Sequence, residues 1–267
     1  MAPRALLLLS LLLLVPASAR AGLLEELVLD VEAGPLAVLR NDGRYGAQGT
    51  QYDASDVGQK ANLVVARRVS VEARLTERHT LILLWAPLEL NTRVRLEEPL
   101  VFRDTTFDAG ATVDHRYLFE GYRASYLFGL LPGGRLRLEV GGSFQLRNAD
   151  VSFTELDTGR FAQETDVGPV FALKARLTYD AGAVWTQLEA DALSTFGLAG
   201  DTEGGIYDVA LTLGVPLSSA RDVDGFLRLR VVGGGAEVPD RELENWGAFF
   251  SASAGLRADL VSLFTRL

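Results

Sequence analysis

Residues 135–147, RLRLEVGGSFQLR, alternate polar and apolar side chains at almost every step. Successive side chains of a β-strand point to opposite faces, so a period of two predicts a strand with one polar and one apolar face. In a soluble sheet the polar face contacts water. In a transmembrane barrel the apolar face contacts lipid and the polar face lines the interior. The rest of the chain favours the second arrangement.

The same period recurs along the chain, and helical periodicity is almost absent after residue 21. Ten segments show the alternation, roughly 25–40, 58–75, 79–96, 111–131, 135–150, 165–179, 183–197, 205–217, 226–236 and 246–260. Long polar connections at 41–58, 97–110, 151–164, 197–204 and 236–245 alternate with shorter ones at 76–78, 132–134, 180–182 and 218–225. An even number of antiparallel strands with long loops at one end and short turns at the other is typical of a bacterial outer-membrane barrel. The sequence therefore predicts an all-β fold, a closed antiparallel up-and-down barrel of about ten strands.

The first 21 residues have the features of a secretory signal peptide. Arg4 precedes an unbroken leucine-rich run, and Ala19 and Ala21 have the A-x-A spacing of a cleavage site. We therefore expect residues 1–21 to be removed and residues 22–267 to form one barrel domain. No other segment has the roughly 20 apolar residues that a transmembrane helix needs. Insertion into a membrane then requires a closed barrel, with both chain ends on the periplasmic side.

Charge and cysteine content exclude several classes of protein. The formal net charge is -9, and removal of Arg4 and Arg20 with the signal peptide makes it about -11, which argues against nucleic acid as a partner. The chain has no cysteine. A disulfide framework and a lipid-anchored cysteine are therefore excluded, and an exported domain must be held together by its core or by closure of its sheet.

The polar strand face carries long side chains of both charges. We expect them to form an ion-pair network that lines the lumen and includes Glu72, Glu89, Arg93, Arg123, Arg135, Arg137, Glu139, Arg147, Lys174, Arg176, Glu189, Asp191, Asp208, Arg228, Arg230 and Arg257. The apolar face has aromatic residues near strand ends, as membrane interfaces select: Tyr117, Phe119, Phe128, Tyr179, Trp185, Tyr207 and Trp246. Ten strands close at a backbone radius of roughly 10 Å, which predicts a packed polar interior or a very narrow passage.

Two places break the alternation. The adjacent Arg67 and Arg68 place one guanidinium on the lipid side, where it would snorkel toward the interface. The phase of segment 111–131 also slips near Glu120 and Gly121, and a β-bulge there is the simplest explanation.

Catalytic and ligand motifs are sparse. His115 is the one weak catalytic candidate, as a base at the rim of the barrel, because His79 falls in a periplasmic turn. No GxSxG elbow and no His-rich metal set is present, so we predict no cofactor and no metal centre. Acidic loop residues are candidate ligands for divalent cations bridged to lipid head groups: Asp53, Asp56, Glu97, Glu98, Asp201 and Glu203.

Several stretches together resemble an uncharacterised family of predicted Gram-negative outer-membrane β-barrel proteins. They are LRND (39–42), LLWAPLEL (83–90), LVFRDTTFDAGATVDHRYLFEGYRASYLF (100–128), FQLRNADVSF (144–153), LEADALS (188–194) and GGGAEV (233–238). The resemblance implies a barrel and carries no established activity.

The leading hypothesis is a monomeric outer-membrane barrel, structural or porin-like with a narrow pore, whose acidic extracellular loops contact lipopolysaccharide, cations or a partner. One alternative is an outer-membrane enzyme with a rim site at His115. A second is a soluble, lipocalin-like carrier with an apolar interior and a polar outer wall.

Overall fold

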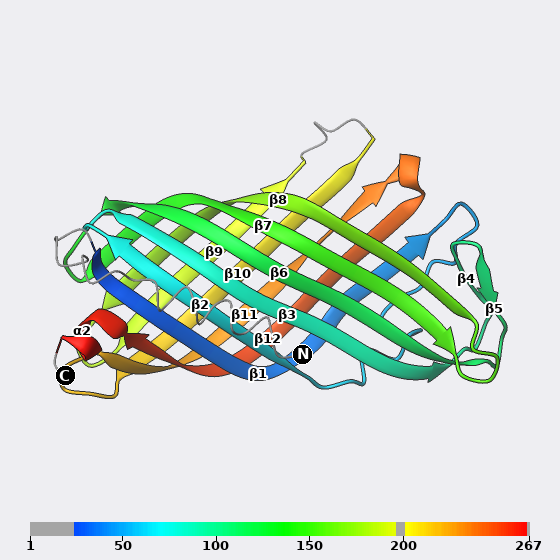
Figure 1. Cartoon of the computed structure of the whole chain (residues 1–267), viewed down its shortest axis with the longest axis horizontal. Coiled ribbons are helices and arrows are strands. Elements are labelled where there is room, and N and C mark those ends of the chain that lie inside the picture. The colour runs from blue at the N-terminus through cyan, green and yellow to red at the C-terminus, as the bar shows by residue number, and fades with distance from the viewer. Residues whose placement is uncertain (1–23, 196–200, 266–267) are drawn as a thin grey trace.

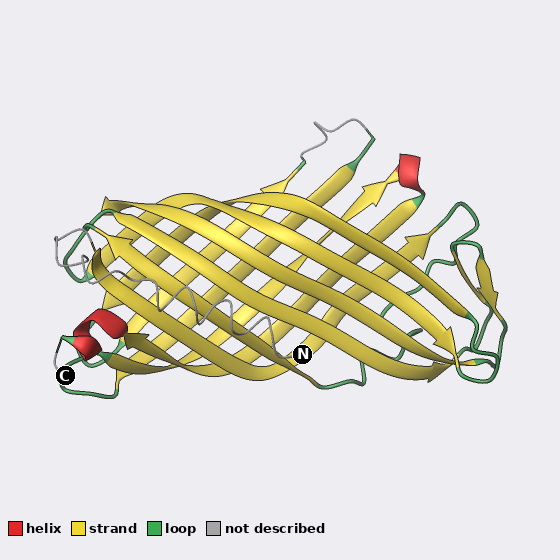
Figure 2. Ribbon diagram, viewed as in Figure 1, coloured by secondary structure: helices red, strands yellow, loops and turns green. Residues whose placement is uncertain are grey.

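The computed structural model describes residues 24–195 and 201–265 of the chain. The predicted signal peptide, residues 1–21, lies outside these ranges. The described residues form one elongated barrel with almost no helix (Figure 2). No helix among them is long and apolar enough to cross a membrane.

Ten strands form the barrel wall and a small hairpin lies at one end (Figure 1). The wall strands are β1 (Leu24–Tyr45), β2 (Val64–Leu75), β3 (His79–Arg95), β6 (Thr112–Leu131), β7 (Leu136–Glu155), β8 (Phe161–Asp180), β9 (Trp185–Ser194), β10 (Glu203–Pro216), β11 (Val223–Val238) and β12 (Leu243–Asp259). The hairpin consists of β4 (Leu100–Phe102) and β5 (Thr105–Phe107). All neighbouring wall strands are antiparallel, and β1 pairs with β12 to close the sheet. The predicted ten-stranded closed barrel is confirmed.

The two ends of the barrel differ in their connections. The turn end has short links such as 132–135, where Gly133 and Gly134 both have φ of +78°, a backbone conformation that glycine adopts without steric cost. It also carries the short helix α2 (Leu260–Phe264), drawn in red at the left of Figure 2. The loop end carries β4, β5 and the 3₁₀ turn η2 (Pro239–Arg241). Strands β7 and β8 continue further into the loop end than the sequence predicts. Together they include most of the predicted loop 151–164.

The predicted bulge near Glu120 is wrong. The β3–β6 and β6–β7 registers pass through this point without a break, with Glu120 opposite both Pro87 and Asn148. What changes at Glu120 is the character of the two faces. Toward the turn end, Arg123 is buried on the inward face and Tyr126 is exposed on the outward face. Toward the loop end, the inward residues become apolar and the outward residues become charged.

The loop end has a hydrophobic core inside the barrel. Segments 46–63 and 96–111, which we call the plug, fold over and into the lumen and contribute most of the buried loop residues. Buried members of this core are Leu36, Val38, Tyr45, Tyr52, Ala54, Val57, Leu90, Leu96, Leu100, Phe102, Phe107, Val113, Tyr117, Val151, Phe153, Ala162 and Phe249. The barrel therefore has a polar interior toward the turn end and an apolar interior beneath the plug.

Three aromatic residues predicted for the outer wall lie inside instead. Tyr117 and Phe119 belong to the inward face of β6, in or against the hydrophobic core. Trp185 is buried near the turn end, where its indole Nε1 donates to Asp224 at 2.8 Å. All three share the strand parity of predicted lumen residues, Arg123 on β6 and Asp191 on β9, so the error came from interpreting aromatic rings near strand ends as a membrane belt.

Candidate functional site

A cluster of buried ion pairs surrounds Arg176 of β8 near the turn end. Arg176 Nη1 lies 2.6 Å from Glu72 on β2, and its Nε lies 2.7 Å from Glu139 on β7. Glu72 also lies 3.7 Å from Arg74 and 3.5 Å from Arg257. Because β2 and β8 are not neighbours in the sheet, the Arg176–Glu72 pair crosses the lumen.

A second cluster surrounds Asp208 of β10, closer to the plug. Asp208 accepts hydrogen bonds from Arg68 of β2 at 3.1 Å, from Arg123 of β6 at 3.0 Å, and from Arg230 of β11. Only 1% of Asp208 is exposed. One carboxylate therefore joins three strands that are spread around the barrel.

Further pairs complete the network between these clusters. Asp191 accepts hydrogen bonds from Arg123 at 3.0 Å and from Lys174 at 2.8 Å, and Lys174 also lies 2.9 Å from Glu189. Buried charges are stable only when paired and hydrogen-bonded, and each of these groups has an oppositely charged partner.

Two acidic residues of β1 also belong to the network, although the predicted site did not include them. Arg228 of β11 lies 3.0 Å from both Asp30 and Glu32. Asp30 and Glu32 alternate with apolar Val31 along β1, and this alternation is the signal that could have added them to the predicted network.

The network fills the middle of the lumen. The cavity left among its side chains has a volume of about 50 Å³. This space lies between paired side chains and is about a tenth of the volume of the larger cavity described below. Arg137 and the more exposed Arg135 line a further cavity of about 230 Å³ at the turn end, which shares Arg176 and Arg257 with the first.

Glu89 and Arg93 do not line the lumen, which corrects two residues of the predicted network. Both are on the outward face of β3: Glu89 pairs with Arg116 at 2.8 Å, and Arg93 pairs with Asp114 at 2.6 Å. Side-chain exposure of Arg93 is 63%. These residues lie on the loop side of the level of Glu120, where the faces exchange character.

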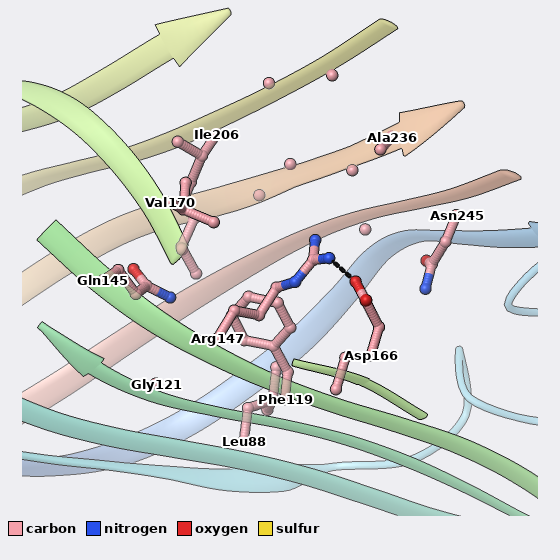
Figure 3. Close-up of a pocket in the computed structure, with 18 of the residues that line it drawn as sticks. Leu88, Phe119, Gly121, Gln145, Arg147, Asp166, Val170, Ile206, Ala236 and Asn245 are labelled. Atoms are coloured by element: carbon pink, nitrogen blue, oxygen red, sulfur yellow. Dashed lines mark hydrogen bonds and ion pairs between the residues drawn. The ribbon is translucent and has the colours of Figure 1, made fainter. Parts of the chain in front are cut away.

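A larger cavity of about 480 Å³ lies between the network and the wall-strand residues of the hydrophobic core, such as Tyr117 and Val151 (Figure 3). Its wall is mostly apolar and includes Leu88, Phe119, Val170, Ile206, Val232 and Phe249. Arg147 lies at its side, paired with Asp166, and Arg68, Arg123 and Arg230 lie at its floor. Sequence reasoning missed this cavity because it assigned the apolar residues to the lipid-facing wall.

His115 is enclosed by the plug. It is 1% exposed, its ring centroid lies 4.5 Å from that of Phe153, and its Nδ1 lies 3.3 Å from Gln59 Nε2. Its Nε2 has no hydrogen-bond partner among the described residues. The surroundings of His115 are those of a core residue.

No protein-family model and no curated protein matches the chain. Among solved structures, the outer-membrane protease OmpT from Escherichia coli superposes with a TM-score of 0.57 at 9% identity, covering 88% of this chain and 97% of OmpT. This chain has the fold of an outer-membrane β-barrel protein. At this identity the likeness extends to the fold alone. The resemblance to one particular uncharacterised family stays a prediction.

Two further barrels align over most of the chain with lower scores. The attachment invasion locus protein Ail of Yersinia pestis has a TM-score of 0.39 at 8% identity, covering 87% of this chain and 99% of Ail. A FadL homologue from Pseudomonas aeruginosa has a TM-score of 0.40 at 8% identity, covering 88% of this chain and 90% of that protein.

Proposed function

We propose that this protein is an integral outer-membrane barrel with a closed lumen, structural in type, whose contacts with other molecules are made at the loop end. The observation that carries the proposal is the ion-pair network. It crosses the lumen between non-adjacent strands and leaves a cavity of about 50 Å³. A barrel closed in this way does not serve as a general diffusion pore.

The outward wall supports placement in a membrane. It exposes large apolar side chains, with Leu173 at 72% and Leu227 at 64% exposure, whereas the charged groups of the same strands point inward. A soluble lipocalin-like carrier would need the opposite arrangement in this half of the barrel. We infer that the long loops face the exterior and both chain ends face the periplasm.

Outward charges near the level of Glu120 support contact with lipopolysaccharide. Arg116 bridges Glu89 at 2.8 Å and Asp150 at 2.6 Å just beyond the apolar wall. Charged groups at this depth meet lipid head groups and any cations held between them.

Two of the loop acids proposed as cation ligands already have partners. Asp56 accepts a hydrogen bond from the backbone N–H of Asp53 at 2.8 Å. A hydrogen bond from the backbone N–H of Ser55 holds the pKa of Asp53 below its usual range, so that carboxylate stays ionised in mild acid.

Planar-bilayer recording tests the closed lumen. We expect no stepwise conductance from the wild-type barrel, whereas the double variant Arg123→Ala, Asp208→Ala, which removes two central members of the network, should give small steps and so prove insertion. Steady open steps from the wild-type barrel would contradict the proposal.

The enzyme alternative has no observation in its favour. OmpT is a protease by name, but 9% identity carries only the fold. The weak catalytic candidate His115 is buried beneath the plug.

A further inference from the structure

The 480 Å³ cavity combines an apolar wall with several cationic groups. Its lining includes five arginines whose side chains lie on the inner side and two carboxylates: Arg68, Arg123, Arg147, Arg230, Arg241, Glu164 and Asp166. Its volume of about 480 Å³ lies within the roughly 300–1,000 Å³ of small-molecule sites. An anionic molecule with a substantial apolar part matches this lining.

Two of these arginines have hydrogen-bonding capacity to spare. The Nε atoms of Arg147 and Arg230 are both buried and have no hydrogen-bond partner among the described residues. Buried donors are nearly always paired in folded proteins, so the protein's own acceptors do not saturate these two arginines. Because protein atoms cover both Nε atoms, a carboxylate in the cavity would bond to the terminal guanidinium nitrogens, and its charge strengthens such a bond.

The cavity continues through the barrel wall between β8 and β9. Pairing of these strands runs from Asp180 opposite Trp185 to Leu173 opposite Ala192 and stops there, while β8 continues without β9 beside it. The two strands diverge toward the loop end in Figure 1. Outward-facing Phe171, 60% exposed on the apolar wall, and Leu193 both line the cavity. The cavity therefore opens toward the surface that we place in lipid.

We propose that this cavity binds a single-chain anionic amphiphile of the fatty-carboxylate class, taken from the bilayer through the opening between β8 and β9. The carboxylate lies on the arginine side, within reach of Arg147, and the chain lies against the apolar wall that includes Phe119 and Ile206. Ligand binding at this site does not depend on the proposed closed lumen. Only the route from the bilayer into the cavity rests on the proposed placement in a membrane.

Gly168 offers a substitution that fills the cavity without a clash. It faces inward on β8 opposite Arg147, between Asp166 and Val170, and a Cβ at this position meets no atom within 4 Å. Gly168→Leu therefore places a side chain in the space that the ligand would occupy. Gly142→Leu is the matched control, because Gly142 lies on the outward face of β7 and its Cβ would make an ordinary 3.5 Å contact.

The test titrates cis-parinaric acid and its methyl ester into the full mature chain in phosphatidylcholine nanodiscs, with empty nanodiscs as the blank. We expect saturable one-to-one binding of the acid, weakened about tenfold or more by Gly168→Leu and unchanged by Gly142→Leu. The methyl ester should bind the wild-type barrel about tenfold more weakly than the acid, because it lacks the charged acceptor. Arg147→Gln should remove that preference, while Asp166 keeps Arg241 as a partner at 3.2 Å.

Three results would each overturn the inference: no saturable binding to the wild-type barrel, equal binding by Gly168→Leu, or equal binding of acid and ester. Retention of the acid preference in Arg147→Gln would overturn the role assigned to Arg147. Because the readout is fluorescence and not conductance, failure here is distinct from failure of the closed-lumen proposal.

Discussion

Asp208 shows how a single residue helps to fill the lumen of this barrel. Its two carboxylate oxygens serve guanidinium groups from β2, β6 and β11, and it is almost fully buried. Three arginines in such a small space repel one another unless an anion lies between them. Asp208 therefore stabilises its strand and also the positions of the arginines beside the cavity.

Replacing Asp208 by Asn should strongly destabilise the barrel. The amide keeps the shape but removes the charge, and breaking a buried pair from one side costs about 3–5 kcal/mol. We expect a large fall in the urea midpoint of unfolding in lipid vesicles, followed by tryptophan fluorescence. Asp114→Asn, which removes the partner of solvent-exposed Arg93, is the control and should leave the midpoint unchanged. Equal midpoints for Asp208→Asn and wild type would show that the cluster contributes no stability.

Replacing His115 by Leu should be tolerated. The imidazole leaves its buried Nε2 without a partner, and leucine fills a similar volume beside Phe153. Gln59 loses one contact but keeps its 2.7 Å bond from Asn41. We expect the free energy of unfolding to change by about 1 kcal/mol or less. Loss of hydrolysis of a lipid or peptide substrate by a correctly folded His115→Leu variant would instead restore the enzyme alternative.

Among the elements, β3 and β6 define the limit of what the sequence reveals. The sequence places Arg123 on the polar strand face, and the structure buries it inside the barrel at 7% exposure. It wrongly places Glu89 and Arg93 in the lumen. In our proposal the membrane ends at the level of Glu120 and water surrounds the barrel beyond it, so the polar face turns outward there without any change of register. Neighbouring strands must be compared in space to see this.

The plug could not be predicted from the sequence at all. Segment 41–58 is polar and rich in glycine, which indicates a solvated loop. The structure nevertheless buries Tyr52 and Val57, and Val57 O accepts a bond from Thr92 Oγ1 at 2.6 Å. A few apolar residues in a polar loop are buried only when the barrel interior provides apolar side chains against which they can pack.

Arg103, in the turn between β4 and β5, should anchor the plug. Its Nε and Nη2 each lie 2.8 Å from Glu164 of β8, and this hydrogen bonding raises the pKa of Arg103. Arg103→Gln should weaken the contact by about 1–2 kcal/mol, since the pair is partly exposed. Hydrogen exchange in residues 46–63 and 99–107 should become several-fold to about tenfold faster.

Arg93→Gln is the control for that experiment, because Arg93 lies outside the plug on the outward face of β3. Unchanged exchange in Arg103→Gln would mean that the apolar core alone holds the plug in place.

At the scale of the whole molecule, both faces of the wall exchange character at one level. Below Glu120 the outside is apolar and the inside charged, and above it the outside is charged and the inside apolar. This level marks the outer membrane boundary in our interpretation. A barrel of the predicted strand number was recoverable from the sequence, but the position of this boundary was not.

Single cysteines on β3 test the boundary, since the chain has none of its own. Leu83 and Asn91 both lie on the outward face, on opposite sides of the level of Glu120. With a membrane-impermeant maleimide on intact cells, Asn91→Cys should be labelled and Leu83→Cys protected by lipid. Rapid labelling of Leu83→Cys would remove the basis for placing this wall in a bilayer.

The hydrophobic core beneath the plug has a consequence for assembly. In the proposed orientation, charged outward groups such as Arg116 and Asp150 cross the hydrocarbon layer before the loop end reaches its final structure. The plug segments become enclosed only after the strands around them have met. From the proposed placement we therefore expect assembly in two stages: the strands of the lipid-embedded portion pair first, and the hydrophobic core at the loop end then forms in water.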